Sequence, residues 1–134
     1  MDKKTILLID DTPSNLILLD NLLRHDYRVK VAVGGAKGLK LALSEDTPDL
    51  ILLDILMPEI DGFAVCEVLQ MNRKTRHIPV MFLTTLHEAE ATARGLAMGA
   101  VDFISKPVGA HDLIHKIASH FEAVAHRDES LSTV

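Results

Sequence analysis

The chain has 134 residues and a net charge of −5, and 48% of its residues are apolar although few are aromatic. This length fits one domain, and the acidic balance argues against a nucleic-acid surface, which needs a basic stripe. The single cysteine, Cys66, excludes an internal disulfide, and no apolar run approaches the roughly 20 residues that span a bilayer, so we expect a cytoplasmic protein without membrane contact.

Short apolar runs predict five strands. In chain order they are Ile6–Ile9, Val29–Val33, Leu50–Leu53, Val80–Leu83 and Val101–Ile104. The first, third and fourth runs are almost continuously apolar, which is typical of strands buried on both faces. The second and fifth runs are mixed in character and therefore suit positions nearer the edges of a sheet.

A segment with helical character follows each run. The predicted helices begin at Thr12-Pro13, span Gly38–Asp46, begin at Asp61-Gly62, span Glu88–Met98 and span His111–Ala125. Five alternations of strand and helix predict an α/β fold, a (βα)5 doubly wound parallel sheet with the flavodoxin-like strand order 2-1-3-4-5. The polar residues 126–134 carry no helical pattern, so we expect one domain over residues 1–125 and a tail or the start of a linker after it.

Polar residues fall at the carboxyl ends of the predicted strands, where ligands bind in this type of sheet. Asp10 and Asp11 end the first strand, Asp54 the third and Thr84 the fourth, and Lys106 follows the fifth. Three neighbouring carboxylates resist joint ionisation unless a hard cation such as Mg²⁺ lies among them. A carboxylate can also attack phosphorus, with a lysine and a hydroxyl contacting the phosphoryl oxygens. Each residue alone is most often structural, and only their coincidence on one edge indicates phosphoryl transfer.

The chain resembles the receiver domain of bacterial two-component response regulators over about residues 4–124. The resemblance rests on four segments, Ile6–Asp11, Leu50–Gly62, Ile78–Thr85 and Gly99–Pro107. It implies phosphorelay signalling, in which Asp54 accepts a phosphoryl group from a histidine kinase or a histidine phosphotransfer protein. The output surface would comprise the fourth helix, the fifth strand and the fifth helix. Such a chain is no enzyme beyond catalysing its own phosphorylation and dephosphorylation, and a phosphorylation-linked homodimer is a further partner that the resemblance allows.

The resemblance implies a Mg²⁺ site around the phosphoacceptor. Asp11 would bind the ion directly and Asp10 through a water molecule, while Asp54 and the backbone carbonyl of Leu56 would complete the protein's share of the ligands. Leu56 and Leu86 are apolar at positions that flank the approach of water to the phosphoryl group in this family. We therefore hypothesise that the phosphoryl group is lost slowly.

The resemblance also implies a switch. Thr84 and Lys106 would contact the phosphoryl oxygens, and Phe103 would be the aromatic side chain that turns inward when Thr84 is drawn toward the phosphate. The Lys106–Pro107 peptide is expected to be cis, which the tertiary amide before proline tolerates.

Two other classes compete with this interpretation. A phosphatase of the haloacid dehalogenase kind also combines an aspartate nucleophile with Mg²⁺, threonine and lysine, but it needs an Asp-x-Asp pair at the end of the first strand, whereas Asp10 and Asp11 are adjacent. A degenerate receiver would act as a phosphorylation-independent binding module. The presence of all five site residues disfavours that alternative.

Overall fold

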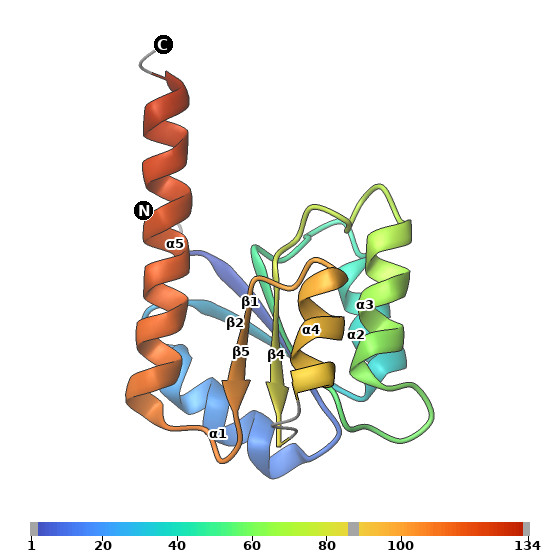
Figure 1. Ribbon diagram of the computed structural model, residues 1–134. Helices are drawn as coiled ribbons and strands as arrows, with labels where there is room; N and C mark the ends of the chain where they lie inside the picture. The colour runs from blue at the N-terminus through green and yellow to red at the C-terminus, as the bar shows by residue number, and fades with distance from the viewer. Residues whose placement is uncertain (1–2, 86–88, 133–134) are drawn as a thin grey trace.

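A parallel five-stranded sheet with helices on both faces forms the protein (Figure 1). The computed structural model describes residues 3–85 and 89–132, with side chains as far as Arg127. Within those residues the elements are β1 (Thr5–Asp10), α1 (Pro13–Leu23), β2 (Arg28–Val33), α2 (Gly35–Ala42), β3 (Leu50–Asp54), α3 (Gly62–Met71), β4 (Val80–Thr84), α4 (Ala89–Ala97), β5 (Asp102–Ser105) and α5 (Ala110–Ser132). The strand order β2-β1-β3-β4-β5 confirms the predicted topology.

The burial of the strands follows the character of the apolar runs. Every residue of β1, β3 and β4 is buried, because these strands lie inside the sheet and are covered on both faces. The edge strands β2 and β5 are partly exposed, as their mixed sequences predict. None of the described helices is both long and apolar enough to cross a membrane.

Alternate residues of the central strands supply two separate cores. Leu7 and Ile9 of β1 pack under α2, α3 and α4, whereas Ile6 and Leu8 pack under α1 and α5. This division is the two-layer arrangement expected when consecutive side chains of a strand point to opposite faces. The helices thereby hold the strands in place, and the pairing of the strands determines where each strand ends relative to its neighbours.

The pairing register brings the carboxyl ends of the inner strands to one level. Ile9 of β1 lies opposite Leu53 of β3, and Thr84 of β4 lies opposite Ser105 of β5. Residues that immediately follow these positions in the chain therefore emerge along a single edge of the sheet. This edge lies at the bottom of Figure 1, where the arrowheads point.

Helix α2 begins earlier and ends earlier than predicted. It spans Gly35–Ala42 instead of Gly38–Asp46, because its glycine-rich first turn carries no apolar pattern to read. Gly35 and Gly38 are nevertheless buried, and a Cβ on Gly38 would meet the side chain of Ile9. At the other end, the hydroxyl of Ser44 donates a 2.7 Å hydrogen bond to the carbonyl of Leu41, which satisfies a terminal carbonyl and ends the helix.

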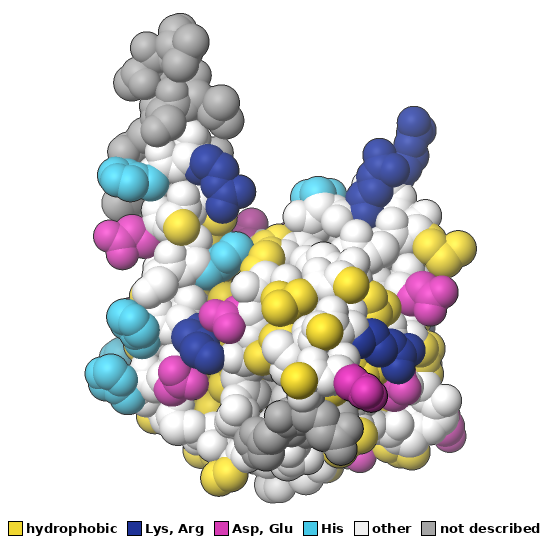
Figure 2. Space-filling model, viewed as in Figure 1, with side chains coloured by type: hydrophobic (Ala, Val, Ile, Leu, Met, Phe, Trp, Pro, Cys, Tyr) yellow, Lys and Arg dark blue, Asp and Glu magenta, His cyan; other side chains and the backbone are white. Residues whose placement is uncertain are grey.

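Helix α5 continues beyond its predicted end at Ala125. It reaches Ser132, so the expectation that residues 126–132 lack helical structure is wrong. The sequence there offers no apolar face, but arginine, glutamate and leucine favour helix through intrinsic propensity. The helix projects past the amino-terminal ends of the strands (Figure 1), and a hollow separates its projecting half from the body (Figure 2). The proposed domain boundary at residue 125 stays a prediction.

Candidate functional site

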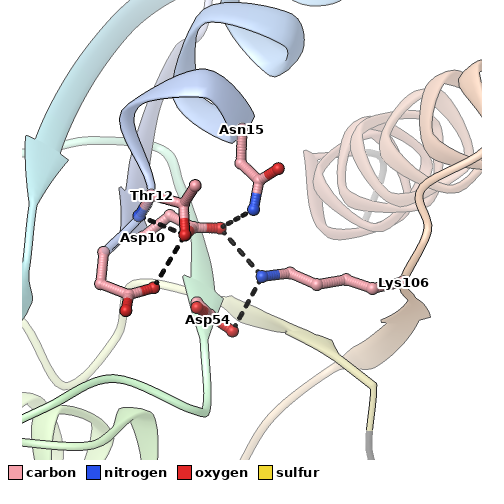
Figure 3. A network of polar contacts seen from close by, with 6 residues as sticks. Asp10, Thr12, Asn15, Asp54 and Lys106 are labelled. Carbon is pink, nitrogen blue, oxygen red and sulfur yellow. Dashed lines mark hydrogen bonds and ion pairs between the residues drawn. The ribbon is translucent and has the colours of Figure 1, made fainter.

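Asp10 is the buried centre of a polar network at the carboxyl edge of the sheet (Figure 3). As the last residue of β1, it directs its carboxylate into the turn before α1. Oδ1 accepts a 2.9 Å hydrogen bond from the backbone N–H of Thr12, and Oδ2 accepts from Lys106 Nζ at 3.1 Å and from Asn15 Nδ2 at 3.5 Å. These donors stabilise the negative charge of the Asp10 carboxylate, which burial alone would destabilise.

Lys106 joins the first strand to the third. Its Nζ lies 3.1 Å from Asp10 Oδ2 and 3.1 Å from Asp54 Oδ1. The backbone N–H of Lys106 donates to the carbonyl of Thr84 at 2.8 Å, which extends the ladder between β4 and β5 by one residue. The predicted cis peptide between Lys106 and Pro107 is present.

Asp54 ends β3 and is only 2% exposed. Burial raises the pKa of its carboxyl from 3.8 to about 6, and the negative charge of Asp10 adds to the rise, while Lys106 opposes it. Burial would also lower the pKa of the Lys106 ammonium, but its hydrogen bonds and charge interactions with the two aspartates outweigh burial and leave that pKa raised. The site therefore keeps its lysine charged and carries more negative charge than one lysine can balance.

The three predicted carboxylates converge. Asp10, Asp11 and Asp54 each place a carboxylate oxygen within 4.8 Å of the others, and Lys106 is the cation in ion-pair contact with two of them. An all-oxygen set with unbalanced negative charge suits a hard divalent cation, and Mg²⁺ is commonly held by few carboxylates and several waters. These residues therefore fit the metal that the sequence predicts.

The remaining predicted site residues lie around this cluster. Thr84 ends β4 and is buried, whereas Leu56 follows β3 with its side chain 53% exposed. The role of the Leu56 carbonyl as a metal ligand stays a prediction, and Leu86 lies outside the described residues.

Phe103 lies in β5 but packs away from the carboxylates. Its ring centroid is 5.5 Å from that of Phe82, and a Cβ on Gly95 of α4 would collide with the far end of the Phe103 ring. The ring is therefore partly buried between β4 and α4, which is an inward orientation, and its turning in response to phosphorylation stays a prediction. The carbonyl of Phe103 accepts a 2.6 Å hydrogen bond from Lys116 Nζ, which ties β5 to α5.

Sequence reasoning missed two residues that shape the site. Asn15 reaches Asp10 from the first turn of α1, and its position five residues after the aspartate was the available signal. Gly62 allows α3 to begin directly against β3, because a Cβ there would collide with the carbonyl oxygen of Asp54. Thr12 lies at the predicted start of α1 but forms no side-chain capping bond, and its hydroxyl donates to Asp11 Oδ1 at 3.3 Å. Asp61 lies at the predicted start of α3 and caps that helix, because its Oδ1 accepts a 2.8 Å hydrogen bond from the backbone N–H of Ala64.

Comparisons with known proteins agree with this geometry. Residues 6–118 match the response regulator receiver domain family. The chain is 38% identical over 124 residues to a probable cyclic di-GMP phosphodiesterase of Vibrio cholerae, covering 92% of this chain and 28% of that protein. It is 35% identical over 113 residues to protein PilH of Pseudomonas aeruginosa, covering 84% of this chain and 93% of that protein.

A solved structure shows the same fold. The CheY-like receiver domain protein of Methanospirillum hungatei superimposes with a TM-score of 0.85 at 26% sequence identity, covering 94% of this chain and 99% of that chain. The chain thus corresponds to nearly all of some relatives, whereas it spans only about a quarter of the length of others, 28% for the phosphodiesterase.

Proposed function

Because this chain belongs to the response regulator receiver domain family, whose members act in two-component phosphorelay signalling, we propose that Asp54 accepts a phosphoryl group in a Mg²⁺-dependent reaction. The observation that carries the proposal is the convergence of three carboxylates within 4.8 Å, with Lys106 Nζ 3.1 Å from two of them, at the carboxyl edge of the sheet. Phosphoryl transfer needs this combination of a nucleophile with fixed positive charge.

The transfer is a displacement at phosphorus. An ionised oxygen of Asp54 attacks the phosphorus of a phosphohistidine, a P–O bond forms while the P–N bond breaks, and the electron pair stays on the departing imidazole, which is then protonated. Lys106 and the Thr84 hydroxyl hold phosphoryl oxygens. Asp10, Asp11, Asp54 and the Leu56 carbonyl would hold Mg²⁺, which supplies positive charge opposite the developing negative charge.

The chain's residues also link the acceptor to a surface. Lys106 is bound to Thr84 through the backbone, and Phe103 of the neighbouring β5 packs between β4 and α4. A phosphoryl group that draws Thr84 and Lys106 toward Asp54 would thereby change the packing of Phe103. The output surface in this proposal is formed by α4, β5 and α5.

The partners follow from the chemistry of the donor. A histidine kinase or a histidine phosphotransfer protein would supply the phosphoryl group, and receiver domains are found in proteins named as histidine kinases, such as one of Formosa agariphila. Receiver domains are generally signalling modules, so we propose that this chain catalyses only its own phosphorylation and dephosphorylation. Its effector and any phosphorylation-linked homodimer belong to the same proposal.

A phosphoryl mimic tests the proposal. We expect beryllium fluoride with Mg²⁺ to shift the amide NMR signals of residues near Asp54 and Thr84 and those of β5. EDTA should abolish the shifts, and Asp54→Asn should abolish them without unfolding the protein. Glu67→Gln, an exposed change on α3, is the matched control and should respond as the wild type does.

The absence of NMR shifts would count against the phosphorylation proposal. If wild-type protein shows no shift at saturating beryllium fluoride and Mg²⁺, the chain is better described as a phosphorylation-independent binding module. Shifts that persist in Asp54→Asn would place the acceptor elsewhere.

A further inference from the structure

A cavity lies at the opposite edge of the sheet from Asp54. It has a volume of about 640 Å³ and is lined by residues that precede β1, β3, β4 and β5, by Gln70 of α3, and by residues of α5 between His120 and Arg127. Pockets for small ligands commonly measure about 300–1,000 Å³. The hollow between α5 and the body in Figure 2 has Lys, Arg and His side chains on both of its walls. None of its lining residues belongs to the phosphoacceptor site.

The charge of this cavity is opposite to that of the protein. Lys4, Arg76 and Arg127 line it from three separate parts of the chain, whereas Asp49 is the single carboxylate among the described side chains of the lining. That carboxylate is already engaged, because Asp49 Oδ2 accepts a 2.8 Å hydrogen bond from the backbone N–H of Thr5. A cationic groove in a chain of net charge −5 attracts a small anion.

The floor of the cavity is apolar and aromatic. Phe121 and Val124 of α5 line it together with Ile78 and Pro79 before β4, and the Phe121 ring also contacts the Tyr27 ring, with centroids 5.6 Å apart. The His120 ring lies against Phe121 with centroids 5.4 Å apart. Such a floor offers a planar ring a surface on which to stack.

One buried polar atom in the lining is without a partner. His120 Nε2 is inaccessible to solvent and makes no hydrogen bond with the described residues. Burial lowers the pKa of this imidazole, and the charge of Arg127 adds to the effect, so the ring is neutral at pH 7 and its nitrogen can pair with a ligand. A buried polar atom that lacks a partner is costly, and a rotation of the His120 side chain that turns Nε2 toward the groove would let the polar edge of a bound ring satisfy it.

We propose that this groove binds a nucleoside phosphate, with the phosphate among Lys4, Arg76 and Arg127 and the base over the Phe121 floor beside His120. Arginine presents its donors in a fork that matches phosphate oxygens, which favours a phosphate over a simple carboxylate. The site is independent of phosphorylation at Asp54, since the two lie at opposite edges of the sheet.

The test is an amide NMR titration with ADP in EDTA, so that the carboxylate site is metal-free. We expect saturable shifts in residues 76–79, 99–101 and 120–127, and none at Asp10 or Asp54. Arg76→Ser should weaken ADP binding roughly tenfold, a factor equivalent to about 1.4 kcal/mol. Arg73→Ser is the matched control, because it lies in the same loop outside the lining and should leave the affinity unchanged.

Probes that carry one part of the ligand complete the experiment. Pyrophosphate and adenosine should each bind more weakly than ADP, and His120→Phe should weaken ADP but not pyrophosphate. The proposal is overturned if ADP gives no shifts at millimolar concentration, if Arg76→Ser binds as tightly as the wild type, or if pyrophosphate matches ADP. Shifts in the groove that follow protein concentration instead of ADP would indicate self-association and would also overturn it. None of these outcomes affects the proposal for Asp54.

Discussion

At the residue scale, Lys106 balances only part of the negative charge that the carboxylates bring to the site. One ammonium contacts Asp10 and Asp54 at 3.1 Å each, while Asp11 brings a third carboxylate within 4.8 Å of both. The raised pKa of Asp54 follows from its burial and from this excess of negative charge. Folding without Mg²⁺ therefore costs free energy at any pH at which Asp54 is ionised.

Removing this charge should stabilise the metal-free protein. A carboxyl whose pKa rises from 3.8 to about 6 on folding holds its proton more tightly in the folded state. Stability therefore falls as pH increases from about 4 to 6, and the loss persists at higher pH. We expect Asp54→Asn to be more stable than the wild type at pH 7 by about 3 kcal/mol, and the difference to vanish below about pH 4.

Urea unfolding in EDTA at several pH values measures the effect. Glu67→Gln is the control for removing an exposed carboxyl and should change stability little. A stability difference between Asp54→Asn and the wild type that stays constant from pH 4 to pH 7 would show that ionisation of Asp54 is not its cause.

Leu56 should influence the lifetime of the phosphoryl group. Its side chain is 53% exposed beside Asp54 and offers water no hydrogen bond. We expect Leu56→Asn to shorten the lifetime of the acyl phosphate severalfold, because an amide can orient water toward phosphorus. Intact-mass measurements after removal of the phosphodonor follow the decay. Met71→Asn, 80% exposed at the end of α3, is the control, and equal lifetimes in the wild type and Leu56→Asn would refute the expectation.

At the scale of whole elements, α4 and β5 meet through an aromatic ring. The Phe103 ring occupies the space where any side chain at position 95 would lie, and two atoms of the Phe82 ring lie 3.1 Å from the same position. The absence of a side chain at Gly95 thus permits the inward orientation of Phe103. The relation between α4 and β5 depends on this glycine as much as on the aromatic residue.

A methyl group at this position should expel the ring. We expect Gly95→Ala to destabilise the fold by about 1–3 kcal/mol through overpacking and to weaken the NMR contacts between the Phe82 and Phe103 rings. It should also reduce the response of β5 to beryllium fluoride. Gly109→Ala is the matched control, since a Cβ there has no neighbour within 4 Å. Unchanged ring contacts in Gly95→Ala would show that α4 yields in place of Phe103.

The elements differ in how well the sequence predicts them. Continuous apolar runs identify β1, β3 and β4, because a strand that is buried on both faces needs apolar residues at nearly every position. The start of α2 was missed because Gly35 packs through the lack of a side chain, which leaves no pattern. The end of α5 was missed because backbone propensity continues the helix after its apolar face has ended.

At the scale of the whole molecule, Mg²⁺ should stabilise the fold. A ligand that binds only the folded state at a hundred times its dissociation constant adds about 2.7 kcal/mol to the free energy of unfolding. We expect EDTA to lower the stability of the wild type at pH 7 and to leave Asp11→Asn unchanged. Urea unfolding with and without Mg²⁺ provides the measurement. Equal stabilisation of both proteins by Mg²⁺ would remove Asp11 from the proposed ligands.

The site was predictable because topology collects residues that are distant in the chain. Parallel strands of known order place Asp10, Asp54 and Lys106 at one edge, so their convergence follows from the fold class. The contact from Asn15 depends on the position of one helical turn, and the inward orientation of Phe103 depends on a rotamer and on a missing side chain. Neither is encoded in a local pattern of residue types.

Because α5 projects beyond the sheet, a small tilt of the helix would move its far end by several ångströms. The helix has 23 residues and is therefore about 34 Å long, and only its first half is clamped against the sheet. If it moves as a rigid rod, a tilt of about 10° at its base displaces its far end by about 6 Å. Lys116 anchors that base to the carbonyl of Phe103. A rearrangement of β5 that leaves the sheet intact would thus move the far end of α5 by more than the width of a side chain.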